Sequence, residues 1–160
     1  MSPVVAEGQR VSGPAGLSVW LPSDWEFARD QLFEFIALGP PEEPYRANMS
    51  IHHVSVDEST PLEDIAQATA ARQAEVLDTF VEYDRRTTDL AGDPAIQREY
   101  GWVQAGTGLV LYQIEVLALP AAAPGRMLEV HATSSAPAYF RYAAMLRRIV
   151  ESIGRESEST

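Results

Sequence analysis

The sequence contains no cysteine and no lysine. Without cysteine there are no disulfides, thiolate nucleophiles, zinc knuckles or cysteine-ligated iron–sulfur clusters. All 12 basic residues are arginine, they stand against 23 acidic residues, and the formal net charge is −11 at pH 7. An acidic surface repels phosphate backbones and anionic lipid, so we expect neither nucleic acid nor a membrane surface as a partner.

Long apolar runs are also missing. No stretch approaches the ~20 consecutive apolar residues that a membrane span requires. The first residues lack the basic and apolar regions of a signal peptide, and we therefore expect a cytoplasmic protein. At 160 residues, 46% of them hydrophobic, the chain fits one domain over residues 1–160 that folds without a disulfide or metal. We expect flexible ends at 1–8 and 154–160.

Alternation of apolar and polar residues, interrupted by turn residues, predicts strands on both sides of one helix. Tight turns join the later four strands, which makes them antiparallel neighbours. The early strands are expected within 11–21 (two strands joined by a turn), 25–28, 31–38 and 48–56, and the later ones at 81–88, 95–103, 109–119 and 126–134.

Two helices are predicted from their start signals and spacing. Thr60 can cap the first helix, Pro61 suits its first helical position and Glu63 completes a capping box, and the helix should run to about Thr79. The second should open at 135–137 and continue to about Ile153. The expected fold is α+β, a single twisted antiparallel sheet of about six to eight strands with two long helices packed on it.

Segments along the whole chain follow the pattern of a known family: Gly16–Trp25, Asn48–Val56, Pro61-Leu62-Glu63, the Leu90–Ala95 turn, Tyr139-Phe140 and Val150–Ile153. With these segments, the order of elements resembles the PsbP-like superfamily, which includes PsbP, the Ran-binding Mog proteins, DcrB and LpqN-type lipoproteins. The resemblance implies an α/β/α sandwich and a binding role, such as adaptor or chaperone, and it carries over no functional residue. The acylated cysteine of LpqN-type leaders is absent here.

We find no motif for catalysis. The sequence has no dinucleotide-binding glycine pattern, no Gly-x-Ser-x-Gly elbow and no phosphate-binding loop. Its paired carboxylates, such as Glu42 and Glu43, are adjacent and fit solvation better than a catalytic cleft. We therefore expect no catalytic residues, no cofactor and no metal.

His52 and His53 are neighbours on a predicted strand, so their side chains should point to opposite faces. We interpret them as structural histidines. Metal ligation would require His131 or carboxylates to converge with one of them.

The late strands carry a face that mixes polar and apolar residues. If the apolar faces of 109–119 and 126–134 lie together, then Gln113, Glu115, Glu129 and His131 share the opposite face. On the preceding strand, one of two alternating sets could join them: Gln97 and Glu99, or Arg98, Tyr100 and Trp102. Polar groups ringed by apolar ones favour a shallow groove, whereas cross-strand pairs on a sheet face explain the same pattern without a ligand.

Three functions remain open from the sequence. The first is a non-enzymatic module that binds an unknown protein or peptide, with a homodimer as another assembly. The second is a carrier of a small hydrophobic ligand on the same face. The third is a hydrolase or metal-dependent enzyme, which a metal at His131 with Glu115 or Glu129 would support. For the first function, Glu115→Lys should impair partner binding with little change in stability.

Overall fold

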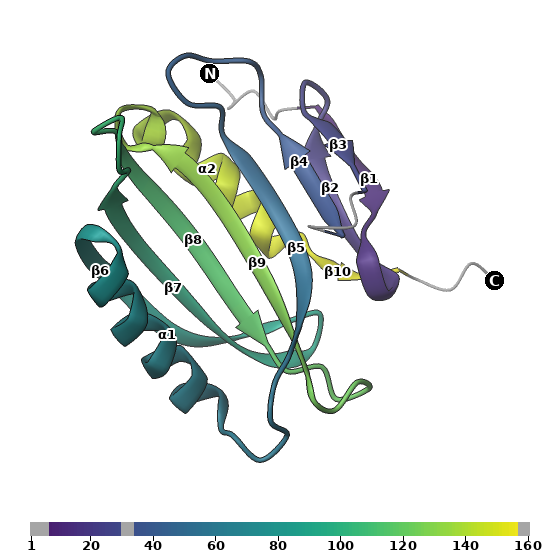
Figure 1. The fold of residues 1–160 in the computed structure, drawn as a ribbon. Coiled ribbons are helices and arrows are strands. Elements are labelled where there is room, and N and C mark those ends of the chain that lie inside the picture. The colour runs from purple at the N-terminus through teal and green to yellow at the C-terminus, as the bar shows by residue number, and fades with distance from the viewer. Residues whose placement is uncertain (1–6, 30–33, 157–160) are drawn as a thin grey trace.

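A seven-stranded antiparallel sheet forms the body of the protein (Figure 1). The computed structural model describes residues 7–29 and 34–156. The sheet confirms the α+β fold and the strand number expected from the sequence, and neighbouring strands run antiparallel throughout. Its order is β3 (Glu26–Ala28), β4 (Phe35–Leu38), β5 (Asn48–Ser55), β9 (Arg126–Ser135), β8 (Val110–Ala118), β7 (Asp93–Val103) and β6 (Asp78–Leu90).

A second, smaller sheet was not expected from the sequence. It joins β1 (Gly8–Ser12), β2 (Leu17–Pro22) and β10 (Gly154–Arg155), with a short 3₁₀ helix, η1 (Pro14–Gly16), between β1 and β2. The expected flexible ends are described only in part, because 1–6 and 157–160 lie outside the described residues. So do 31–33 at the start of the expected strand 31–38.

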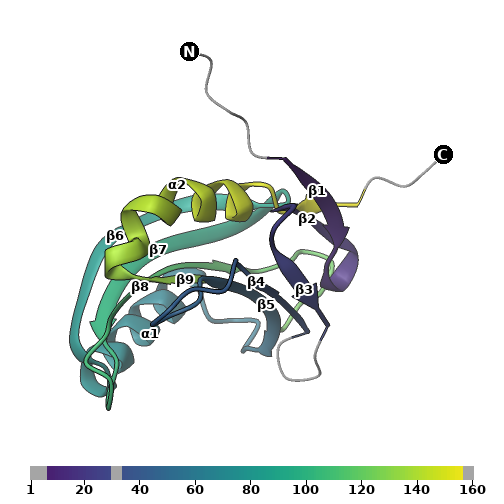
Figure 2. The same cartoon turned by 90° about the horizontal axis from the view of Figure 1, so that it is seen from above.

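The two long helices cover opposite faces of the main sheet (Figure 2). They are α1 (Leu62–Val76) and α2 (Ala136–Glu151). The expected capping box of α1 is wrong in detail. Pro61 is extended and occupies the N-cap position, and no side chain caps this helix. Thr60 therefore lies one residue too far from the first turn. The helix ends three residues before Thr79, because β6 begins at Asp78.

The two faces of the sheet bury different kinds of residue. Under α2 the core is apolar, with Leu146 and Ile149 packed with Ile114 and Val130. Under α1 the apolar cluster is small, because the only buried residues of that helix are two alanines. This thin apolar layer leaves room for polar side chains between α1 and the sheet. No helix in the described part of the chain is long and apolar enough to cross a membrane.

Candidate functional site

The strand register gathers the predicted polar residues on the α1 side of the sheet. Arg98 of β7 lies opposite Glu115 of β8, which in turn lies opposite His131 of β9. Two residues further along β7, Tyr100 lies opposite Gln113 of β8. Two more of the predicted site residues share this face, because successive side chains of a strand alternate between the two faces. Glu129 lies two residues before His131, and Trp102 lies two residues after Tyr100 and opposite Leu111.

Helix α1 seals part of this face, which we call the sealed half: Arg98, Tyr100 and Glu115. Their exposed fractions are 0%, 1% and 2%. Arg98 Nη1 donates to Glu115 Oε1 at 2.7 Å, and Arg98 Nη2 donates to Gln73 Oε1 of α1 at 2.8 Å. Removing one partner of a buried ion pair strongly destabilises the fold, because the other charge stays buried without compensation. Glu115→Lys should therefore unfold the protein, which reverses the expectation from the sequence.

The hydroxyl of Tyr100 is the centre of the hydrogen bonding in the sealed half. It donates to Glu115 Oε2 at 2.9 Å and accepts from Gln73 Nε2 at 3.0 Å. It also accepts from Gln113 Nε2, whose own carbonyl accepts from Thr133 Oγ1 at 2.7 Å. One donor and two lone pairs are thus all used, as a buried hydroxyl requires.

Burial and charge set the protonation states here. Burial by itself raises the pKa of Glu115, but the hydrogen bond from His131 and the charges of His131 and Arg98 outweigh it, so the pKa lies below its usual value. Burial, followed by the charge of Glu115, raises the pKa of Tyr100. Glu115 is therefore a carboxylate and Tyr100 a neutral phenol, which fits the donor and acceptor roles above.

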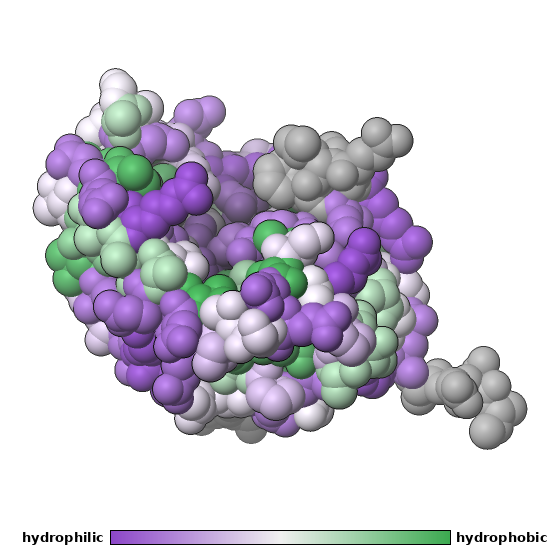
Figure 3. Space-filling model, turned by 60° about the horizontal axis from the view of Figure 1, so that its bottom comes forward, coloured by the Kyte–Doolittle hydropathy of each residue, from purple (hydrophilic) through white to green (hydrophobic). Residues whose placement is uncertain are grey.

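The rest of this face, over β4, β5, β9 and the Gln113 position of β8, is only partly buried, and we call it the open half. Figure 3 shows a hollow on the α1 side, with hydrophilic residues in its depth and hydrophobic residues at its border. The strand register places Ile36 of β4 and His52 of β5 on the same face as His131 of β9. The open half consists of Ile36, Leu38, Asn48, His52, Val54, Gln113, Glu129 and His131.

The two neighbouring histidines lie on opposite faces. His52 Nε2 is 2.7 Å from Glu129 Oε2 in the open half, and this hydrogen bond outweighs burial to raise the pKa of His52. His53 Nδ1 is 2.8 Å from Glu34 Oε2 on the other side of the sheet. His131, which belongs to the open half, has its Nε2 3.2 Å from Oε2 of Glu115 in the sealed half. His131 therefore connects the open half to the sealed half.

Sequence reasoning missed Gln73 and did not place His52 in this site. Gln73 carries a weak signal, since it lies three residues after the buried Ala70 and therefore close to the same side of the helix. The strand pattern places His52 on one face of β5. Its partner Glu129 follows only from the pairing of β5 with β9, strands that are far apart in sequence.

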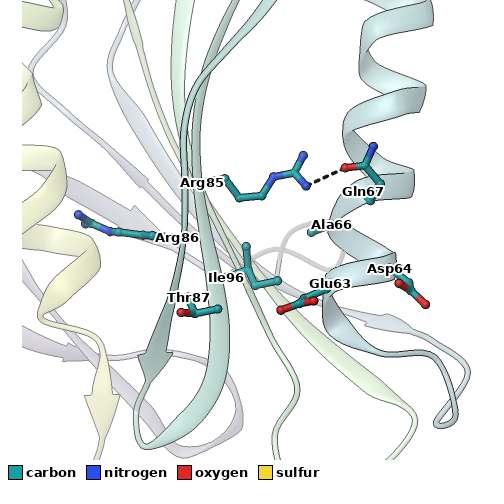
Figure 4. A pocket seen from close by; sticks show the side chains of 8 residues that line it. All are labelled: Glu63, Asp64, Ala66, Gln67, Arg85, Arg86, Thr87 and Ile96. Atoms are coloured by element: carbon teal, nitrogen blue, oxygen red, sulfur yellow. Dashed lines mark hydrogen bonds between the residues drawn. The ribbon is translucent and has the colours of Figure 1, made fainter.

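A cavity of about 430 Å³ lies between α1 and β6, away from the open half (Figure 4). In this view Arg85 points at Gln67 of α1, to which it donates at 2.9 Å, while Arg86 points away from the helix. Arg85 also forms an ion pair with Glu82. These polar groups make the cavity a poor site for an apolar ligand. Its lining is Glu63, Asp64, Ala66, Gln67, Arg85, Arg86, Thr87 and Ile96.

Known structures match this fold over nearly the whole chain. The cyanobacterial PsbP protein of Synechocystis sp. PCC 6803 has 13% identity and a TM-score of 0.67, with 98% of this chain and 96% of that chain covered. LpqN, involved in cell envelope biogenesis of Mycobacterium tuberculosis, has 15% identity and a TM-score of 0.65, with 94% and 91% covered. The Saccharomyces cerevisiae Ran-binding protein Mog1p has 7% identity and a TM-score of 0.61, with 94% and 96% covered.

By sequence, no protein-family model and no curated protein matches. At such low identity the structural similarity concerns the arrangement of helices and strands and transfers no residue's role. The resemblance expected from the sequence is thereby confirmed at the level of architecture, and the chain has the PsbP-like fold.

Proposed function

We propose that the chain is a non-enzymatic binding module, an adaptor or chaperone that holds a segment of another protein in the open half. The observation that carries this proposal is the composition of the open half. Ile36, Leu38 and Val54 bring apolar side chains, while Gln113 and Asn48 bring amide groups to the same half-exposed surface. Apolar contact area with a few placed polar groups is the make-up of a peptide-binding surface.

The favoured occupant is a polypeptide segment with apolar side chains and a net positive charge. The chain carries a formal charge of −11, which favours a cationic partner. A basic segment is steered toward such a surface, and its association slows as salt rises. Nucleic acid is repelled by the same charge.

A binding role suits the sealed half as well. Glu115 is the most buried carboxylate of this face, and its two oxygens are engaged by Arg98, Tyr100 and His131. A general base must reach the proton that it removes. Glu115 does not reach the surface and instead supports the floor of the open half. The Ran-binding activity in the name of Mog1p also accords with a protein partner for this fold.

The other functions have less support. A small hydrophobic ligand needs an enclosed apolar pocket. The open half mixes apolar side chains with charged and amide groups, and half of the residues that line the 430 Å³ cavity are charged. A second copy of the chain is an alternative occupant of the open half, and the experiment below separates it from a different protein. The cytoplasmic location stays a prediction from the sequence.

The test compares two substitutions on opposite faces of the sheet. Ile36→Asp places a charge in the open half. Tyr83→Asp is the matched control, because Tyr83 is 60% exposed and stacks on Tyr112 on the α2 side. Each variant and the wild type serve as bait in the native organism, and recovered proteins are quantified by mass spectrometry. The thermal midpoint of each bait is measured beforehand.

We expect a stoichiometric partner with the wild type and with Tyr83→Asp, and at least a tenfold lower recovery with Ile36→Asp. A different protein is then confirmed by titrating the purified partner, and a homodimer by sedimentation of the chain alone. Recovery of no stoichiometric protein in a monomeric chain would sink the proposal. Loss of the partner with Tyr83→Asp alone would move the site to the other face.

A further inference from the structure

Two imidazoles and one carboxylate converge in the open half. His52 and Glu129 lie directly opposite each other on β5 and β9, and His131 follows Glu129 by two residues on the same face. One potential ligand atom from each residue lies within 4.8 Å of the other two. The rings of His52 and His131 have centroids 5.5 Å apart. All three side chains are about one-fifth exposed, so an ion can reach them from water.

The surroundings of His131 orient its ring in the manner of a metal ligand. Its Nε2 lies 3.2 Å from Glu115 Oε2, and the other oxygen of Glu115 is held by Arg98 at 2.7 Å. A carboxylate bonded to one ring nitrogen fixes the tautomer and leaves the second nitrogen as a ligand atom. Arg98 and Glu115 are themselves immobilised under α1, so this support is rigid.

His52 contributes a second unusual feature. Its Nδ1 is buried and has no hydrogen-bond partner within residues 7–29 and 34–156. A buried polar atom without a partner is uncommon in a native protein and calls for an explanation. Because Nδ1 is buried, Nε2, which lies 2.7 Å from Glu129 Oε2, is the ring nitrogen that an ion shared with this carboxylate would take.

We infer that His52, Glu129 and His131 form a binding site for a divalent transition-metal ion of the Zn²⁺ class. Imidazole and carboxylate ligands suit Zn²⁺ and its neighbours, whereas an all-oxygen set would suit Mg²⁺ or Ca²⁺. Three protein ligands leave a fourth tetrahedral position, which would be filled by water or by a group of a bound molecule. The ion would also link β5 to β9, beyond the strands β6, β7 and β8 on which α1 packs.

Calorimetry with ZnCl₂ tests this site. The protein is prepared without an affinity tag, treated with EDTA, dialysed into a non-coordinating buffer and titrated with the metal alone. We expect one equivalent of Zn²⁺ per chain. His52→Ala and His131→Ala should each weaken binding by about tenfold or more, and the double variant should lose the saturable heat. In the wild type, titration with Co²⁺ should produce the visible absorption bands that are typical of four- or five-coordinate Co²⁺.

His53→Ala is the matched control, since His53 is the remaining histidine of the sequence and lies on the other face. It should bind Zn²⁺ like the wild type. The thermal midpoint is measured for each variant with and without Zn²⁺, and only the shift caused by the metal is compared, so a general loss of stability does not imitate a loss of binding.

Three results would overturn the inference: no saturable binding to the wild type, equal affinity in the double variant, or equal weakening in His53→Ala. The two experiments are separable, because Ile36→Asp alters no ligand and should keep the Zn²⁺ affinity. Zn²⁺ binding in a chain that recovers no protein partner would refute the proposed function and favour the metal-dependent enzyme considered from the sequence. A chain that binds its protein partner but no Zn²⁺ would refute this inference alone.

Discussion

The sealed half and the open half lie on the same face of the same sheet, yet they carry polar residues for different reasons. In the sealed half, Arg98 and Glu115 have their charges matched within the protein and have lost water. In the open half, His52 and Glu129 pair while one-fifth exposed. The difference arises because α1 packs on β6, β7 and β8, whereas β5 lies beyond β9 in the order of strands. The same kind of residue is thus structural under the helix and available beside it.

The largest effect should come from breaking the buried ion pair. Glu115→Ala leaves the buried Arg98 guanidinium with only the longer, 3.5 Å contact to the Glu82 carboxylate, and we expect a loss of about 3–5 kcal/mol in the free energy of unfolding. Urea denaturation measures it. The double variant Arg98→Met with Glu115→Leu should recover most of this loss, because neither charge is then buried. A loss below about 1 kcal/mol for Glu115→Ala would show that this half is not sealed.

A smaller loss should follow from removing one hydroxyl of the sealed half. Tyr100→Phe leaves amide donors of Gln73 and Gln113 without their acceptor, which costs about 1–3 kcal/mol. Tyr83→Phe, on an exposed ring, is the control and should stay within about 0.5 kcal/mol of the wild type. Equal effects of the two substitutions would contradict the assignment of Tyr100 as the central hydrogen-bonding group.

The smallest effect should come from the open half. In metal-free protein, Glu129→Gln removes the charge that faces His52 while keeping the shape of the side chain. A partly exposed ion pair contributes about 0–1 kcal/mol, so the urea midpoint should hardly move. A loss comparable to that of Glu115→Ala would erase the distinction between the two halves, since the open half would then be structural too.

Much of this face could be predicted from the sequence. The alternation in Val110–Ala118 and Arg126–Ser135 puts Gln113, Glu115, Glu129 and His131 on one side, and the register agrees. This prediction succeeds because it is local: successive side chains of a strand point to opposite faces whatever the strand packs against. The separation of His52 from His53 follows for the same reason.

The accessibility of these residues could not be predicted. Helix α1 has a weak apolar pattern: its buried residues are two alanines, and Val76 is 67% exposed. The pattern therefore does not say which strands the helix covers. The contact between Gln73 and Arg98 joins residues 25 positions apart, and it exists only once the helix has docked.

The sequence alone determined the alternation of faces, the order of the helices and strands, and the acidic charge, because each depends on near neighbours or on composition. Tertiary structure decided which residues of the polar face are sealed, and it decided that His52 meets Glu129 and His131. Both outcomes require strands and helices that are distant in the chain to pack in one particular register, and no local pattern records that choice.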